Sequence, residues 1–273
     1  MRENWLILAT GGLFSGILAG LLGIGGGTVL VPLLVTLGYA PIQAVATSSL
    51  AILVTSISGS IQNWRMGYFN WKRVSLLGFP AVVTSQIGVY VASRIQPYIL
   101  LLAFGILLLI NIYLVNLRQH LTTKQTSTET QFNPLLARLF TGGAAGILAG
   151  LFGVGGGVIM VPLQMLLLKE EIKVAIQTSL GVIVITAISA TVGHTVTGNV
   201  LFIPGLLLGC GGLLGAQIST RVLPKLPDRT VSFVFRLFLG ILSIYVFWQA
   251  WQSYSAIAML NLFTNNIAIQ IDL

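Results

Sequence analysis

The stretch GILAGLLGIGGGTVLVPLLV, residues 16–35, decides the fold of this chain because it occurs twice. Its near copy, GILAGLFGVGGGVIMVPLQM, occupies residues 146–165 and agrees with it at 13 of 20 positions. At the same offset of 130 residues, Ser48 and Ser49 fall on Thr178 and Ser179. A match of this length far exceeds what apolar composition alone gives, so we predict two homologous halves.

The composition is that of a membrane protein. Of the 273 residues, 55% are hydrophobic and only 7% are charged, whereas about 25% are charged in a typical soluble domain. Several uncharged runs approach the roughly 20 residues that a membrane-spanning helix needs. An ordinary cytosolic enzyme is therefore excluded, and we expect the chain to cross the inner membrane several times in contact with the lipid bilayer.

The net charge of +8 does not indicate a nucleic-acid partner. The 14 Lys and Arg residues lie in short segments between apolar runs, where basic residues set the orientation of a membrane protein. The first 20 residues have the outline of a secretory signal, but their sequence recurs in the second half. We therefore expect this segment to be retained as part of the fold.

A polar linker, residues 118–134, divides the chain. It separates a first transmembrane repeat, residues 1–117, from a second, residues 135–252, and residues 253–273 form a C-terminal tail to which the sequence assigns no role. Transporters are commonly built from two such repeats, with the substrate site at the interface between them. A homo-oligomer is also compatible with this sequence.

Each half opens with an apolar run of 33 or 34 residues that must be interrupted. The interruptions are GIGGG at residues 23–27, followed by Pro32, and GVGGG at residues 153–157, followed by Pro162. Within a helix a glycine costs about 1 kcal/mol and a proline about 3 kcal/mol, so we predict a break at each cluster. Backbone groups freed by a break cannot face lipid, so each break must lie within protein or line a wet cavity.

The distribution of basic residues bears on whether the broken run crosses the membrane. If it crosses, the 14 basic residues divide seven against seven and specify no orientation. If it enters and returns on one side, they divide twelve against two, with only Arg2 and Arg94 outside. Because basic residues favour the cytoplasm, we prefer the second arrangement, which places the linker in the cytoplasm. The predicted fold is an all-α membrane protein with two inverted repeats, each a re-entrant broken helix followed by about three transmembrane helices.

The breaks are candidate binding sites for an anion. A helix that restarts after a glycine cluster presents free amide groups and a partial positive charge. Matched neutral donors follow in each half, at the start of the second apolar run and, after a one-residue slip in the alignment, at a glutamine in the third. The predicted substrate-binding residues are Gly25, Gly26, Gly27, Thr28, Ser48, Ser49, Gln86, Gly155, Gly156, Gly157, Val158, Thr178, Ser179 and Gln217.

Each of these residues also has a structural interpretation. Serine and threonine often bond to carbonyls of their own helix, and glutamine can join two helices. The small-residue steps at Gly12, Gly16 and Gly20, repeated at residues 142, 146 and 150, we assign to helix packing alone. His194, which has no basic counterpart in the first half, is expected to lie at a helix interface, and a role in proton relay is the alternative.

No catalytic, metal or cofactor site is predicted. All six acidic residues lie outside the apolar runs, which argues against a buried carboxylate relay or a sodium site. Two histidines and the single cysteine, Cys210, do not form a metal-ligand set. GIGGGT also lacks the Lys-Ser/Thr pair of a phosphate-binding loop.

The doubled AGLLGIGGGTVLVP and AGLFGVGGGVIMVP segments, followed by TSSL and QTSL, resemble the TauE/SafE family of sulfite exporters over residues 11–251. The resemblance implies transport of small sulfur oxyanions such as sulfite or sulfonates. Because inverted repeats around a broken helix are what alternating access needs, we expect a transporter that works by alternating access between the two repeats. An anion channel is the main alternative, and a membrane-embedded enzyme or a non-transporting scaffold is less consistent with the residues.

Overall fold

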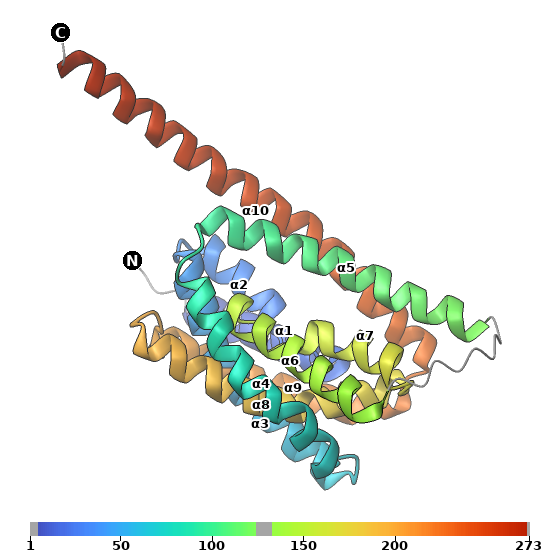
Figure 1. Ribbon diagram of the computed structural model, residues 1–273. Coiled ribbons are helices and arrows are strands. Elements are labelled where there is room, and N and C mark those ends of the chain that lie inside the picture. The colour runs from blue at the N-terminus through green and yellow to red at the C-terminus, as the bar shows by residue number, and fades with distance from the viewer. Residues whose placement is uncertain (1–4, 124–132, 272–273) are drawn as a thin grey trace.

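The computed structural model describes residues 5–123 and 133–271, and every regular element in these ranges is a helix (Figure 1). Eight helices are long and apolar enough to cross a membrane. They are α1 (Trp5–Leu22), α3 (Pro41–Arg65), α4 (Trp71–Ala92), α5 (Pro97–Thr123), α6 (Pro134–Phe152), α8 (Ile172–Val196), α9 (Phe202–Val222) and α10 (Asp228–Ile271).

Three shorter helices complete the chain: α2 (Gly27–Thr36), α7 (Gly157–Leu167) and the 3-10 helix η1 (Leu223–Lys225). Most of the predicted linker lies outside the described residues. The predicted tail continues α10, which extends well beyond the other helices (Figure 1).

The long apolar runs break where the sequence predicts. Helix α1 ends at Leu22 and α2 begins at Gly27, while α6 ends at Phe152 and α7 begins at Gly157. The first three glycines of each cluster, Gly23, Gly25 and Gly26 and their counterparts 153, 155 and 156, adopt the left-handed backbone conformation, with φ between 61° and 84°. Residues with a side chain rarely adopt this conformation, which explains why glycine occupies these positions.

After each break the chain turns back on itself. The Ser15 hydroxyl on α1 donates a 2.9 Å hydrogen bond to the carbonyl of Gly26, and Leu33 on α2 packs against Gly11. Helix α2 therefore returns alongside α1 towards the end from which α1 started. Gly156 lies against the carbonyl of Ala145 in the same way, so α7 begins its return alongside α6.

The small-residue steps form two matched helix pairs. A methyl group on Gly12 would lie 2.1 Å from the carbonyl oxygen of Leu208 on α9, and one on Gly142 would lie 2.1 Å from that of Leu77 on α4. The contacts continue in register at the following steps, so α1 runs parallel to α9 and α6 runs parallel to α4. The predicted packing role of these glycines is confirmed.

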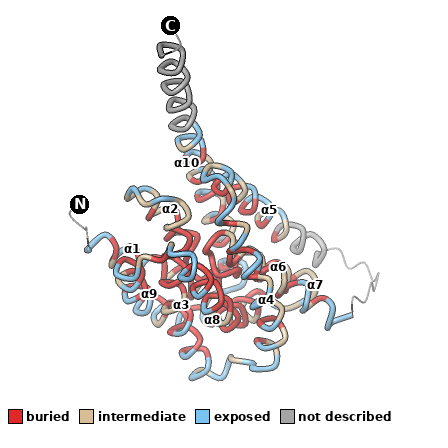
Figure 2. The backbone as a smooth tube through the Cα atoms, turned by 60° about the vertical axis from the view of Figure 1, so that its left-hand side comes forward, coloured by how far each residue is buried: buried red, intermediate tan, exposed pale blue. Residues whose placement is uncertain are grey.

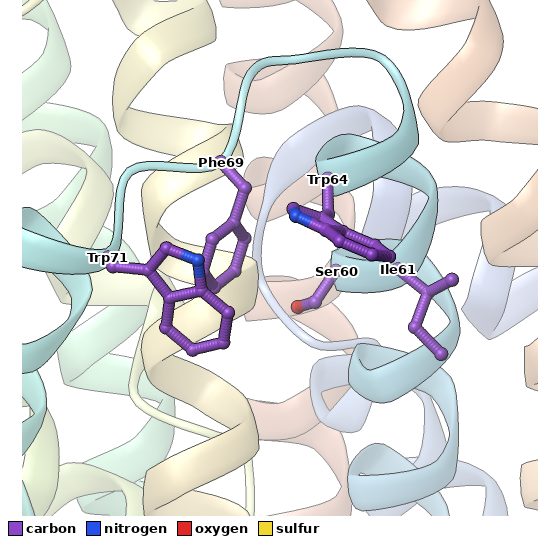
Figure 3. A pocket seen from close by; sticks show the side chains of 5 residues that line it. All are labelled: Ser60, Ile61, Trp64, Phe69 and Trp71. Atoms are coloured by element: carbon purple, nitrogen blue, oxygen red, sulfur yellow. The ribbon is translucent and has the colours of Figure 1, made fainter.

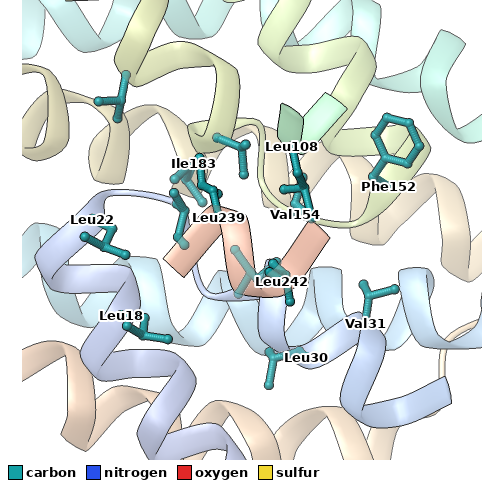
Figure 4. Close-up of a cluster of buried hydrophobic side chains, with 14 of the residues drawn as sticks. Leu18, Leu22, Leu30, Val31, Leu108, Phe152, Val154, Ile183, Leu239 and Leu242 are labelled. Carbon is teal, nitrogen blue, oxygen red and sulfur yellow. The ribbon is translucent and has the colours of Figure 1, made fainter. Parts of the chain in front are cut away.

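Both halves contribute to one hydrophobic core. Helices α3 and α8 are the most buried spans, and the tube in Figure 2 is red chiefly in the interior of the bundle. Figure 4 shows core side chains from both halves, including Phe152, whose ring stacks on that of Phe104 at 5.4 Å. The exposed side chains include large apolar groups such as Phe79 and Val196, as expected for surfaces that face lipid.

Candidate functional site

The two glycine breaks pack against each other. A methyl group on Gly27 would lie 2.3 Å from the carbonyl oxygen of Gly153, and one on Gly157 would lie 2.1 Å from that of Gly23. These contacts are reciprocal, since exchanging the two halves turns one into the other. The breaks therefore meet at the interface between the repeats, and glycine is required there for the backbones to approach so closely.

One serine from each half ties the two breaks together. The Ser48 hydroxyl on α3 donates a 2.7 Å hydrogen bond to the carbonyl of Gly153, and the Ser179 hydroxyl on α8 donates a 2.8 Å bond to that of Gly23. Both serines are fully buried.

The matching bonds of Ser48 and Ser179 to the opposite breaks show that these two serines are equivalent, which corrects the alignment of the two halves. Ser48 corresponds to Ser179, whereas the sequence comparison pairs Ser48 with Thr178. The extra residue lies earlier than the sequence suggests, because α7 has 11 residues and α2 has 10.

Both returning helices begin without a side-chain cap. Gly26 and Gly156 occupy the N-cap positions in the left-handed conformation, and their carbonyls accept the first helical bonds, from Leu30 at 3.3 Å and Met160 at 3.1 Å. The first amide groups of a helix have no helical acceptor. Each half thus directs a buried helix start at the interface between the repeats.

Thr28 adds an unused polar group to the first turn of α2. Its side chain is completely buried, and its hydroxyl has no hydrogen-bond partner. Val158 holds the matching position in α7 and is also completely buried. A buried hydroxyl without a partner is costly in a folded protein, so Thr28 is a candidate contact for a ligand at this helix start.

Two isoleucines close the interface. The side chains of Ile52 on α3 and Ile183 on α8 lie against both Gly25 and Gly155. Figure 4 shows Ile183 and Val154 among the core side chains around the breaks. The hydroxyl of Thr186 donates a 3.1 Å bond to the carbonyl of Gly155, a contact that the sequence did not predict. The side chains of Ile52 and Ile183 thus pack against both breaks.

The remaining predicted site residues make other contacts. The Gln86 amide donates 2.7 Å bonds to the carbonyl and the hydroxyl of Ser189, which links α4 to α8. Ser49 bonds to the carbonyl of Val45 in its own helix at 3.0 Å. Thr178 is buried and Gln217 is half-buried. These contacts fit the structural interpretation of Gln86 and Ser49, and they do not bring the glutamine to the glycine clusters.

His194 and Asn63 occupy equivalent buried positions near the ends of α8 and α3. His194 Nε2 lies 3.0 Å from the carbonyl oxygen of Gly150, so the histidine joins α8 to α6. Both polar atoms of the Asn63 amide are buried without a partner. Within the described part of the chain, no three His, Cys, Asp or Glu side chains are grouped closely enough to hold a metal ion.

A separate cavity of about 290 Å³ lies at the turn between α3 and α4, lined by Ser60, Ile61, Trp64, Phe69 and Trp71 (Figure 3). Its lining is almost entirely apolar, and both tryptophans are exposed. Tryptophan gathers where a membrane meets water, so this cavity marks one edge of the lipid-embedded zone. It is distinct from the glycine interface.

The comparisons with known proteins agree with this architecture. The family model described as "Sulfite exporter TauE/SafE" matches residues 8–246. A probable membrane transporter protein, YunE, of Bacillus subtilis is 26% identical over 90% of this chain and 98% of its own length. One from Methanocaldococcus jannaschii is 28% identical over 86% and 92%. "Sulfite exporter TauE/SafE family protein 1" of Arabidopsis thaliana is 31% identical, over 42% of this chain and 26% of its own length.

No solved structure matches the chain. The family model nevertheless covers almost all of both repeats, and the helices have the length and composition to cross a membrane several times. The chain belongs to the sulfite exporter TauE/SafE family and is a multi-pass membrane transporter.

Proposed function

We propose that the chain transports small sulfur oxyanions, such as sulfite or sulfonates, by alternating access, and that the anion binds between the starts of α2 and α7. One observation carries the proposal. Two helix starts meet at the repeat interface, and beside one of them the Thr28 hydroxyl is buried without a partner. Helix starts stabilise anions through their amide groups and dipoles, so such a site needs no buried cation.

The sulfur chemistry of the solute is inferred from the family. The matching family model is named for sulfite export, and so is the Arabidopsis relative. The neutral donors at the interface fit a small anion, because backbone amides and a hydroxyl bind oxygen atoms without the desolvation cost of a lysine or arginine.

Helix directions support an inverted arrangement of the repeats. Since α2 returns along α1 and α7 begins its return along α6, each pair enters and leaves on one face, and three helices per half then cross. An odd number of crossings inverts the second repeat relative to the first. The basic residues then divide twelve against two, which favours a cytoplasmic location for the linker.

Alternating access would require the central contacts to open on one side at a time. Ser48 holds the second break from α3, and Ser179 holds the first from α8. In an inverted structure these two bonds belong to opposite routes out of the centre. We infer that rocking of the repeats releases one bond while the other persists.

Thr28→Val offers a sharp test, because valine is the residue found at the matching position, Val158. The substitution keeps the shape of the side chain and removes only the hydroxyl. Uptake of labelled sulfite into liposomes should require an about tenfold higher sulfite concentration for half-maximal rate, corresponding to about 1.4 kcal/mol of lost binding. Thermal stability should be unchanged or higher, since a buried unpartnered hydroxyl is removed.

Thr10→Val is the matched control, since it makes the same substitution at an exposed residue whose hydroxyl bonds within its own helix, and its uptake should equal that of the wild type. Equal sulfite uptake with and without the wild-type protein would overturn the proposed substrate. An unchanged concentration dependence in Thr28→Val would overturn the proposed site. Flux that fails to saturate and shows no counterflow would indicate an anion channel.

A further inference from the structure

A charged cluster lies outside the glycine interface, at one end of the bundle. It consists of Arg73 in the first turn of α4, Arg138 in the second turn of α6, and Glu170 in the connection between α7 and α8. The parallel packing of α4 and α6 brings the arginines together, since the contact of Gly142 with Leu77 places Arg138 level with Arg73. The two guanidinium groups therefore flank one site at the same end of the molecule.

Glu170 enters this site and fills it imperfectly. Its Oε1 lies 3.6 Å from Arg73 Nε, which is longer than a good charge-assisted hydrogen bond. Only 10% of the Glu170 side chain is exposed, and its Oε2 is buried without a hydrogen-bond partner. Burial raises the pKa of Glu170, while the charges of Arg73 and Arg138 oppose that shift, so both guanidinium groups act on this carboxyl.

Two further polar atoms in this region have no partner. Arg138 Nε is buried and makes no hydrogen bond. The hydroxyl of Thr141, one turn further along α6, is completely buried and also has no partner. A positive and a negative group thus lie near each other with unused hydrogen-bonding capacity. The carboxylate has too few well-placed oxygens to satisfy the groups around it.

The fold itself does not require this cluster. The residues equivalent to Arg138, Arg73 and Glu170 in the other halves of the repeat pair are Leu8, Pro204 and Tyr39, respectively. Leu8 and Pro204 are buried there as apolar packing. The two ends of a nearly symmetric bundle therefore differ, with an ionic cluster at one end and apolar side chains at the other.

We propose that Arg73 and Arg138 form a second anion-binding site, for a tetrahedral or pyramidal oxyanion group, and that the Glu170 carboxylate occupies this site as an internal competitor. An oxyanion carries three or four oxygens, enough to bond both guanidinium groups at once. When such an anion binds, Glu170 leaves the arginines and moves towards solvent. The oxyanion could be a free ion or the phosphate monoester of a phosphatidic acid headgroup, because both carry at least three oxygens that can accept hydrogen bonds.

The test measures binding of inorganic sulfate to the purified full-length protein in phosphatidylcholine nanodiscs by calorimetry. Glu170→Gln removes the competitor and should bind sulfate at least about tenfold more tightly than the wild type, the factor expected when one charge-assisted contact no longer competes. Glu171→Gln is the matched control, because it makes the same change in net charge at the neighbouring exposed residue, and it should bind as the wild type does.

Removing an arginine as well should abolish the gain. Glu170→Gln/Arg138→Gln and Glu170→Gln/Arg73→Gln should both return to the wild-type affinity, and the second variant keeps the test available if the first fails to fold. Nanodiscs that contain phosphatidic acid separate the two sources. A free-ion site keeps the gain in sulfate affinity of Glu170→Gln over Glu171→Gln, whereas a headgroup site loses that gain. The proposal would be overturned if Glu170→Gln and Glu171→Gln gained equally in sulfate affinity. It would also be overturned if both double variants kept the gain of Glu170→Gln.

This outcome is independent of the central site. Thr28→Val, placed in the Glu170→Gln background, should leave the gain in sulfate affinity intact, since the two sites share no residue. Failure of sulfite transport therefore would not remove the second site, and failure of the second site would not remove the central one.

Discussion

Ser48 donates a 2.7 Å hydrogen bond from its buried hydroxyl to the carbonyl oxygen of Gly153, a residue in the opposite half of the chain. Ser179 makes the same contact with Gly23. Each repeat thus supplies a full-length helix that holds the break of the other repeat. The contact couples the shape of each break to the position of the partner repeat, as the proposed rocking of the repeats requires.

Ser48→Ala is expected to destabilise the protein by about 1–3 kcal/mol, because it leaves a buried carbonyl without a donor. Ser49→Ala is the matched control, since Ser49 is also buried but bonds only within its own helix. Its effect should be a few tenths of a kcal/mol at most, because the Val45 carbonyl keeps its helical partner. Thermal unfolding in detergent measures the stability of both variants. Equal losses of stability would show that the bond from Ser48 to Gly153 contributes no more than a bond within one helix.

Gly142→Ala and Gly143→Ala should have opposite effects although they are neighbours. A methyl group on Gly142 would lie 2.1 Å from a backbone oxygen of α4, whereas at Gly143 the nearest atom is the Thr84 methyl at 3.7 Å. The first substitution must separate α6 from α4 and lower the melting temperature. The second should stabilise by up to about 1 kcal/mol through helix propensity. A stable Gly142→Ala variant would contradict the close packing.

Lys169→Gly should stabilise the chain by about 1 kcal/mol, the cost of a left-handed conformation for a residue with a side chain. Lys169 has φ 55° and is the only non-glycine with positive φ among residues 5–123 and 133–271. Its counterpart after α2 is Gly38, with φ 90°. Gly38→Ala should lose a similar amount, and both changes can be followed by thermal unfolding. A loss of stability in Lys169→Gly would show that the lysine side chain makes a compensating contact.

Stability should depend on pH through Glu170. Burial, the largest cause, raises the pKa of this carboxyl above its ordinary value of 4.5. The folded chain therefore binds this proton more tightly than the unfolded chain. Protonation of Glu170 therefore stabilises the folded chain at pH values below the ordinary pKa. This stabilisation is lost as the pH rises through the raised pKa of the folded chain. Glu170→Gln should flatten this decline in melting temperature above pH 4.5, whereas Glu171→Gln should not. Parallel curves for wild type and Glu170→Gln would refute the assignment.

Local sequence information was sufficient for the breaks and the packing steps. Three adjacent glycines with a following proline cannot continue a helix, and glycines four residues apart create a smooth helix face, so both features follow from the residues themselves. The repeat also predicted that the two breaks would be equivalent. Their direct contact, and the bond from Ser48 to Gly153, follow from how the halves pack.

Other features depended on three-dimensional packing that the sequence does not reveal. The extra residue in α7 was hidden because serine follows a hydroxyl residue in both TSSL and QTSL, so two alignments score alike. Gln86 looked like a free donor, but the approach of α4 to α8 gives it Ser189 as a partner. Arg73 and Arg138 are 65 positions apart, and only the parallel packing of α4 and α6 makes them neighbours.

Anomalous X-ray diffraction from crystals soaked in selenite tests the central claim most directly, because selenite has the shape and charge of sulfite and selenium can be located unambiguously. We predict a selenium peak between the starts of α2 and α7, within hydrogen-bonding reach of the Thr28 hydroxyl and weakened in Thr28→Val crystals. A structure with full selenite occupancy elsewhere, and none between the two glycine clusters, would contradict it.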